Sequence, residues 1–154
     1  MLTLSILVRK TKSFLKIPLR ERLMFFEAYI LSGIYRFAIL VIPFKRLRKH
    51  IGKHRLESSR EVPIENYKVA RLVLMAVDRA TIRTPWESKC LVRALTAQRM
   101  LKKRKIYTTL YLGVGKSIDN KMLAHAWLRC GQVIVTGGEV IQGFKEVAKF
   151  SNEH

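Results

Sequence analysis

Two short segments of this chain carry residues that could perform chemistry together. The first, at 85–95, reads Pro-Trp-Glu-Ser-Lys-Cys-Leu-Val-Arg-Ala-Leu and predicts the start of a helix with Cys90 in its opening turn. The second, at 124–128, reads Ala-His-Ala-Trp-Leu and predicts a strand that presents His125. A thiol at a helix N-terminus that faces an imidazole on a later strand is the arrangement of a cysteine nucleophile and its general base.

The start of the cysteine helix has two candidate N-caps. Thr84 and Glu87 have the spacing of a capping box, with Pro85 at the first helical position. Ser88 is the other candidate, and we expect it to be the N-cap because Cys90 then lies in the first turn. The unpaired backbone N–H groups and the positive end of the helix dipole there favour a thiolate.

A catalytic imidazole also needs a hydrogen-bond acceptor on its second ring nitrogen. Across the expected hairpin, His125 should face residues 136–138, which include no carboxylate. Thr136 is our candidate for the third catalytic position. A backbone carbonyl, Glu139 reaching back, and Asp119 in the preceding loop stay open as alternatives. The sequence therefore predicts a nucleophile and a base and leaves the orienting group undecided.

The other thiol and imidazoles are expected to have no catalytic role. Cys130 lies at the hairpin turn with no base beside it, so a structural role is favoured. Two cysteines form neither a disulfide framework nor a metal-ligand spacing. His50 and His54 are four residues apart in a basic stretch without an acidic or cysteine partner, so we expect a solvated linker there and not a metal site.

The elements that must position Cys90 and His125 follow from the apolar pattern. Helices are expected over 21–50, 64–83, and 84 or 88 to 103. Strands are expected over 107–114, 122–130 and 132–136, with a tight hairpin at 130–132. The predicted fold class is α+β, with a helical N-terminal region at 1–60 and a core at 61–154 in which the cysteine helix packs on a small antiparallel sheet.

Charge restricts the partners. The chain has 30 Lys and Arg against 11 Asp and Glu, a net charge of +19, which attracts nucleic acid, acidic lipid or an acidic peptide. No helix-turn-helix, zinc-finger or RNA-recognition signature occurs, so nucleic acid is the disfavoured partner. The segment after Met1 lacks a basic start, and its apolar run at 2–8 is too short for a secretory signal, so we expect a cytoplasmic location.

The apolar stretch at 20–50 is the part of the sequence closest to a membrane segment. A spanning helix needs about 20 largely uncharged residues, and Glu27 and Arg36 interrupt this one. Burial against the rest of the protein is the expectation. Peripheral contact with a membrane, helped by the basic residues at 45–49, is the alternative.

At these residues the chain resembles the lasso-peptide leader peptidases, which are stand-alone transglutaminase-like cysteine proteases of lasso-peptide maturation. The similarity extends from about residue 20 to 138. The matching segments are the two quoted above together with Gln-Arg-Met-Leu-Lys-Lys-Arg-Lys-Ile at 98–106, Tyr-Leu-Gly-Val-Gly at 111–115 and Pro-Phe-Lys-Arg-Leu at 43–47.

The resemblance implies a transglutaminase/papain-like core, Cys90 as nucleophile and His125 as general base and acid. It implies no metal and no cofactor. The family's usual triad has an aspartate shortly after the histidine strand, and Thr136 with two glycines occupies that region here. The implied substrate is a ribosomally made precursor peptide whose leader is removed, and the implied partners are a small leader-recognition protein and an ATP-dependent lasso cyclase.

Two other classes of function compete with this one. The chain could be a non-catalytic basic adaptor or membrane-surface protein, in which residues 20–50 are the working part. It could also perform another acyl-transfer reaction on the same fold, such as deamidation, because a fold hosts many chemistries.

Overall fold

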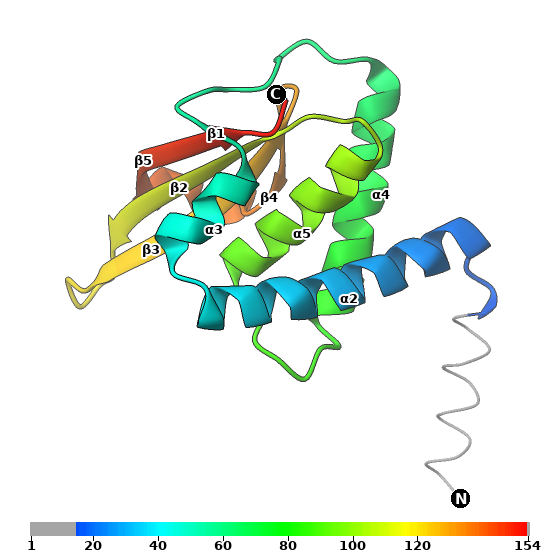
Figure 1. The fold of residues 1–154 in the computed structure, drawn as a ribbon, viewed down its shortest axis with the longest axis horizontal. Helices are drawn as coiled ribbons and strands as arrows, with labels where there is room; N and C mark the ends of the chain where they lie inside the picture. Colours follow the sequence, from blue (N-terminus) through cyan, green and yellow to red (C-terminus); the bar gives the residue numbers. More distant parts are fainter. Residues whose placement is uncertain (1–14, 154) are drawn as a thin grey trace, which may run out of the picture.

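The computed structural model describes residues 15–153, which form four α-helices and a five-stranded antiparallel sheet (Figure 1). The helices are α2 (Leu19–Val41), α3 (Phe44–Ile51), α4 (Ile64–Thr81) and α5 (Cys90–Lys103). α4 and α5 pack against one face of the sheet, and α2 packs across these two helices. The strands are β1 (Lys53–His54), β2 (Thr109–Lys116), β3 (Met122–Cys130), β4 (Val133–Thr136) and β5 (Phe144–Ser151), and a 3-10 helix, η1 (Gly138–Gly143), precedes β5. The predicted α+β class is confirmed.

The sheet has the order β1-β5-β2-β3-β4. The three strands expected from the sequence are present as β2, β3 and β4, and the hairpin turns at Gly131 and Gln132 between paired Cys130 and Val133. Two described strands were not predicted. β1 lies inside the stretch expected to be a linker, and β5 inserts between β1 and β2.

The apolar stretch at 20–50 forms two helices and not one. α2 ends at Val41, and Pro43 is the N-cap of α3. Proline disfavours a helical conformation in the residue before it, which explains the break. The inner face of α2, with buried Met24, Ala28 and Ser32, packs against the rest of the protein.

The core lies between the helices and one face of the sheet. It includes Ala94, Leu95, Ala97, Met100 and Leu101 of α5 and Val73, Val77 and Ala80 of α4. From the sheet it takes Leu110, Ala126, Leu128 and Phe150. Because side chains alternate along a strand, His125 and Trp127 of β3 lie on the opposite face of the sheet.

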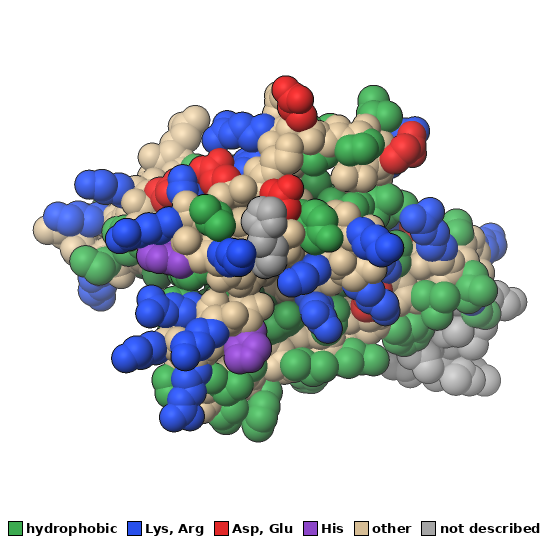
Figure 2. All heavy atoms as spheres, turned by 45° about the horizontal axis from the view of Figure 1, so that its top comes forward, with side chains coloured by type: hydrophobic (Ala, Val, Ile, Leu, Met, Phe, Trp, Pro, Cys, Tyr) green, Lys and Arg blue, Asp and Glu red, His purple; other side chains and the backbone are tan. Residues whose placement is uncertain are grey.

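The basic excess covers much of the surface. Figure 2 shows Lys and Arg side chains spread over the visible face, with few acidic ones among them, and an apolar band along the lower edge. In Figure 1, α2 lies across the lower part of the molecule.

Candidate active site

Cys90 is the first residue of α5. The N-cap is Lys89, which makes no side-chain capping hydrogen bond, and Arg93 N–H donates to its carbonyl over 3.1 Å. The expected N-cap, Ser88, lies one residue before the observed one, and its hydroxyl lies 3.2 Å from the hydroxyl of Thr84. The thiol still lies in the first turn, where the helix leaves its N–H groups without intrahelical acceptors.

The loop before α5 is held by the inner face of α2. The indole of Trp86 donates to Ser32 Oγ over 3.3 Å and meets Tyr29 edge-on at 5.1 Å between ring centroids. A Cβ added to Gly33 would lie 2.9 Å from the Trp86 ring, so only glycine leaves room for it. α2 thereby fixes the segment that leads into Cys90.

Two ion pairs connect α2 to the segments on either side of α5. Arg36 pairs with Glu87 in the same loop at 3.3 Å. Glu27 pairs with Arg104, just past the end of α5, at 2.7 Å. Burial would raise the pKa of Glu27, but Arg104 and Lys103 hold it below its usual value. The two charges that interrupt the apolar stretch in the sequence therefore both point toward the protein body and are paired there.

His125 lies in β3, opposite Gly113 of β2. As expected, it shares a face with Trp127, since the two rings stack at 6.1 Å. Its ring also packs against Phe144, with 4.9 Å between the ring centroids. Between them on this face of the sheet, β2 has Gly113 and Gly115, which have no side chains to fill the space. The neighbouring indole of Trp127 stacks on Tyr111 at 5.5 Å, so the imidazole ends a row of aromatic rings.

The second ring nitrogen of His125 has a backbone acceptor. His125 Nε2 lies 2.8 Å from the carbonyl oxygen of Gly137. A carbonyl only accepts, so this contact places the proton on Nε2 and leaves Nδ1 as the basic nitrogen. Of the residues 136–138 that were expected to face His125, Gly137 reaches the ring, and the acceptor is one of the alternatives left open by the sequence, a backbone carbonyl.

Thr136, our first candidate for the third position, makes no hydrogen bond to the His125 ring. Its side-chain oxygen is buried and has no hydrogen-bond partner among the described residues. Glu139 is exposed in η1, and Asp119 is exposed in the turn between β2 and β3. The structure places the Gly137 carbonyl against the ring, where a side-chain acceptor had been expected.

The structure does not join Cys90 to His125. The half-buried Cys90 packs against the core between helices and sheet, and its thiol has no hydrogen-bond partner among the described residues. His125 extends from the face of β3 opposite Ala126 and Leu128, which belong to that core. Hydrogen bonds between catalytic groups are often long or absent before substrate binds, so the pair stays a prediction.

Cys130 is fully buried at the end of β3. Burial raises the pKa of its thiol, an effect that the neighbouring Arg129 only partly offsets. A thiol with a raised pKa is a poor nucleophile at neutral pH, which agrees with the structural role favoured from the sequence.

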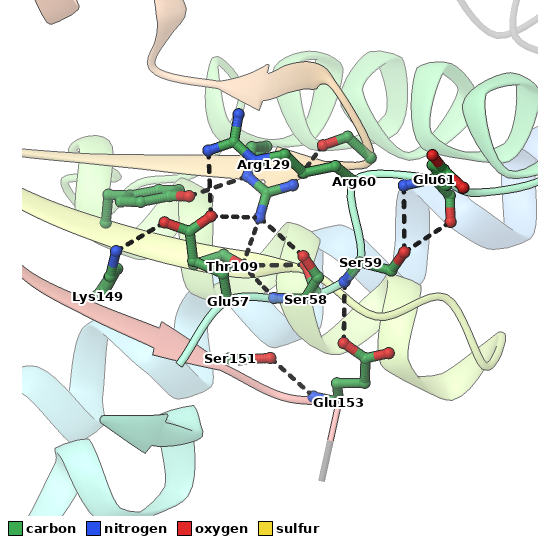
Figure 3. Close-up of polar contacts among 12 residues, drawn as sticks. Glu57, Ser58, Ser59, Arg60, Glu61, Thr109, Arg129, Lys149, Ser151 and Glu153 are labelled. Carbon is green, nitrogen blue, oxygen red and sulfur yellow. Dashed lines mark hydrogen bonds and ion pairs between the residues drawn. The ribbon is translucent and has the colours of Figure 1, made fainter. Parts of the chain in front are cut away.

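A polar cluster on the sheet face away from the helices was missed by sequence reasoning (Figure 3). At its centre Arg129, 5 % exposed, donates to Ser58 O and Tyr111 Oη over 2.9 Å and to Glu57 at 3.2 Å. Lys149 donates to the other carboxylate oxygen of Glu57 over 2.7 Å. This hydrogen bond lowers the pKa of Glu57, against the effect of burial. The cluster fastens the loop after β1 across β2, β3 and β5.

Histidines 50 and 54 do not form a metal site in the structure. His54 packs against Phe150 at 5.2 Å, and His50 Nδ1 lies 3.3 Å from the carbonyl of Arg46. Within residues 15–153, no group of three or more His, Cys, Asp or Glu side chains could hold a metal ion.

Comparison with protein families connects this architecture to a known class. The model of the transglutaminase-like superfamily matches residues 38–149, which include both Cys90 and His125. The chain belongs to this superfamily. Comparisons with curated proteins and with solved structures returned no significant match.

Proposed function

We propose that this chain is a cysteine peptidase that removes the leader from a ribosomally made lasso-peptide precursor, with Cys90 as nucleophile and His125 as general base. The observation that carries the proposal is the position of Cys90. In a member of the transglutaminase-like superfamily, a half-buried thiol stands at the first residue of a helix with no side-chain cap. The leader and lasso specificity rest on the segment resemblance described above.

The proposed chemistry uses groups already described. The Cys90 thiolate attacks the scissile carbonyl, and N–H groups of the first turn of α5 hold the oxyanion. His125 first takes the proton of the Cys90 thiol on Nδ1, because Nε2 is engaged by the Gly137 carbonyl, and then gives this proton to the departing amine of the core peptide. Water then hydrolyses the thioester, which releases the leader with a free carboxylate. This chemistry requires the imidazole to lie within hydrogen-bond reach of the thiol, and substitutions at Cys90 and His125 test that requirement.

The basic surface supports a peptide substrate with acidic character. With a net charge of +19, the chain attracts an acidic leader or an acidic leader-recognition protein and repels basic competitors. The lasso cyclase would act on the product, whose new N-terminus the cleavage exposes. We place these steps in the cytoplasm, where Cys90 stays reduced.

The test combines the purified chain with a precursor peptide encoded beside its gene, with and without the leader-recognition protein, and identifies the products by mass spectrometry. We expect two fragments from the wild type and none from Cys90→Ala. A single peptide of altered mass would show deamidation or amide transfer on the same fold. No product, together with a thiol that iodoacetamide labels no faster than a free cysteine, would favour the non-catalytic adaptor.

A further inference from the structure

The outer face of α2 is a continuous apolar surface. Its eight large side chains that are more than half exposed are Leu19, Leu23, Phe26, Ile30, Ile34, Phe37, Leu40 and Val41. From Leu19 to Leu40 they follow one another at three or four residues, which places them on one side of the helix, and Val41 lies four residues after Phe37. At 1.5 Å per residue the stripe is about 33 Å long. Soluble monomers rarely expose apolar patches of this extent unless something binds there.

The charges of α2 are arranged so that they leave this stripe uninterrupted. Glu21 pairs with Arg79 of α4 at 3.1 Å, and Glu27 and Arg36 pair on the inner side as described above. Every exposed residue of α2 after Arg20 is apolar. These ion pairs therefore keep Glu21, Glu27 and Arg36 away from the outer face.

Basic residues stand at both ends of the stripe. Arg20 is exposed in the first turn of α2, and α3 begins directly after Pro43 with exposed Phe44 and four exposed basic residues, Lys45, Arg46, Arg48 and Lys49. Figure 2 shows this arrangement as an apolar band along the lower edge with Lys and Arg side chains beside it.

We propose that this surface, the outer face of α2 with the basic residues of α3, docks the protein on an anionic lipid bilayer. An apolar helix face flanked by Lys and Arg is the composition of a helix that lies in the membrane interface, with its apolar side inserted by about 5–10 Å. A second copy of the chain fits less well, because two molecules of net charge +19 repel each other.

α2 lies on the bilayer and does not cross it. By length and hydropathy alone it is the one described helix that could span a membrane. Its inner face, however, carries ion pairs to α4 and to the segments just before and just after α5, and it packs against Trp86 at Gly33. Spanning would break these contacts and expose the core, whereas interfacial binding keeps all of them.

The test is flotation of the full chain with vesicles of mixed phosphatidylglycerol and phosphatidylcholine, compared with pure phosphatidylcholine. We expect binding to the anionic vesicles only, weakened in high salt because the basic residues are screened. The double variant Ile30→Glu/Phe37→Glu should bind at least about a hundredfold more weakly. Changing Lys45, Arg48 and Lys49 to Gln should also weaken binding about a hundredfold.

Ile118→Glu is the matched control. Ile118 is fully exposed in the turn between β2 and β3, away from the stripe, so its variant should bind like the wild type. Circular dichroism checks that each variant is folded. Absence of flotation would overturn the proposal, as would flotation that the Ile30/Phe37 variant retains. Light scattering that shows a dimer dispersed by that variant, with no vesicle binding, would assign the stripe to a second copy.

Discussion

Gly137 offers the sharpest test of how His125 is oriented. Its φ is +75°, and an added Cβ would lie 2.5 Å from Ala126 O and 3.1 Å from His125 Nε2. An alanine in the left-handed region costs about 1–2 kcal/mol. The contact with a backbone oxygen adds to this because neither segment can yield cheaply. We expect Gly137→Ala to lose at least about 2 kcal/mol, which lowers Tm by about 4–8 °C in a domain of this size.

The same substitution should affect cleavage by more than its stability loss accounts for. Displacing the Gly137 carbonyl removes the hydrogen bond that fixes His125, and a neutral hydrogen bond of about 1 kcal/mol corresponds to roughly a fivefold to tenfold loss in rate. Rates are measured on the precursor peptide well below the variant's Tm. Nitrogen-15 NMR of the histidines checks the cause directly, because the wild type should carry its His125 proton on Nε2.

Gly138→Ala provides the comparison. Its added Cβ would lie 3.3 Å from Ile134 Cγ2, a methyl group, and its φ lies outside the left-handed region, so stability and rate should change little. If Gly137→Ala cleaves at the wild-type rate and keeps the Nε2 proton signal, the carbonyl does not orient the ring. That result would return the question to Thr136 and Glu139.

The remaining predictions concern the thiols, the third position and the polar cluster. Cys90→Ala should abolish cleavage while Cys130→Ala retains most of it; equal loss in two folded variants would refute the assignment. Thr136→Val should leave urea stability unchanged or raised, because its buried hydroxyl has no partner among the described residues, and should slow cleavage at most about tenfold. Glu139→Gln should have little effect, and a thousandfold drop at unchanged stability would show that it replaces the family's aspartate. Glu57→Gln should cost about 2 kcal/mol at pH 7 in urea unfolding. Since the pKa of Glu57 is lowered by folding, its contribution is complete above the unfolded carboxyl pKa and is lost as pH falls through the lowered folded one, so the two proteins should converge in acid below that lowered pKa. A difference that persists in acid would mean that the carboxylate charge is not the cause.

Local pattern was enough to predict several elements of this protein. The range 64–83 was expected to be helical and forms α4 at Ile64–Thr81, and the range 122–130 was expected to be a strand and forms β3 at those bounds. In both ranges the local sequence alone contains the apolar pattern that indicates the element. Cys90 was expected in a first helical turn for the same reason, since Pro85 and the polar residues around it end one element and begin another.

β5 could not be predicted in this way. Phe144 and Phe150 do alternate with charged residues such as Lys145 and Lys149, which is a weak strand signal. The strand becomes stable only between β1 and β2, whose residues lie far from it in the sequence. Strand propensity depends on the neighbours that a strand receives, and these are set by the tertiary fold.

Tertiary structure alone also decided how polar groups are used. Arg129 looks like one more surface charge in a basic chain, yet it is buried against Glu57, 72 residues earlier. The acceptor of His125 is a backbone carbonyl, which every residue carries and no side chain reveals. The β3–β4 pairing that precedes Gly137 also contains a register shift, and a shift of one residue depends on the packing of the whole sheet.

For α2, the sequence alone determined that the segment is apolar and helical. Which of its sides is covered depended on α4, α5 and the Trp86 loop, because burial is a relation between elements that are distant in the chain. The apolar residues on the other side are the same in kind, and they stay exposed only because the described part of the fold places no element over them.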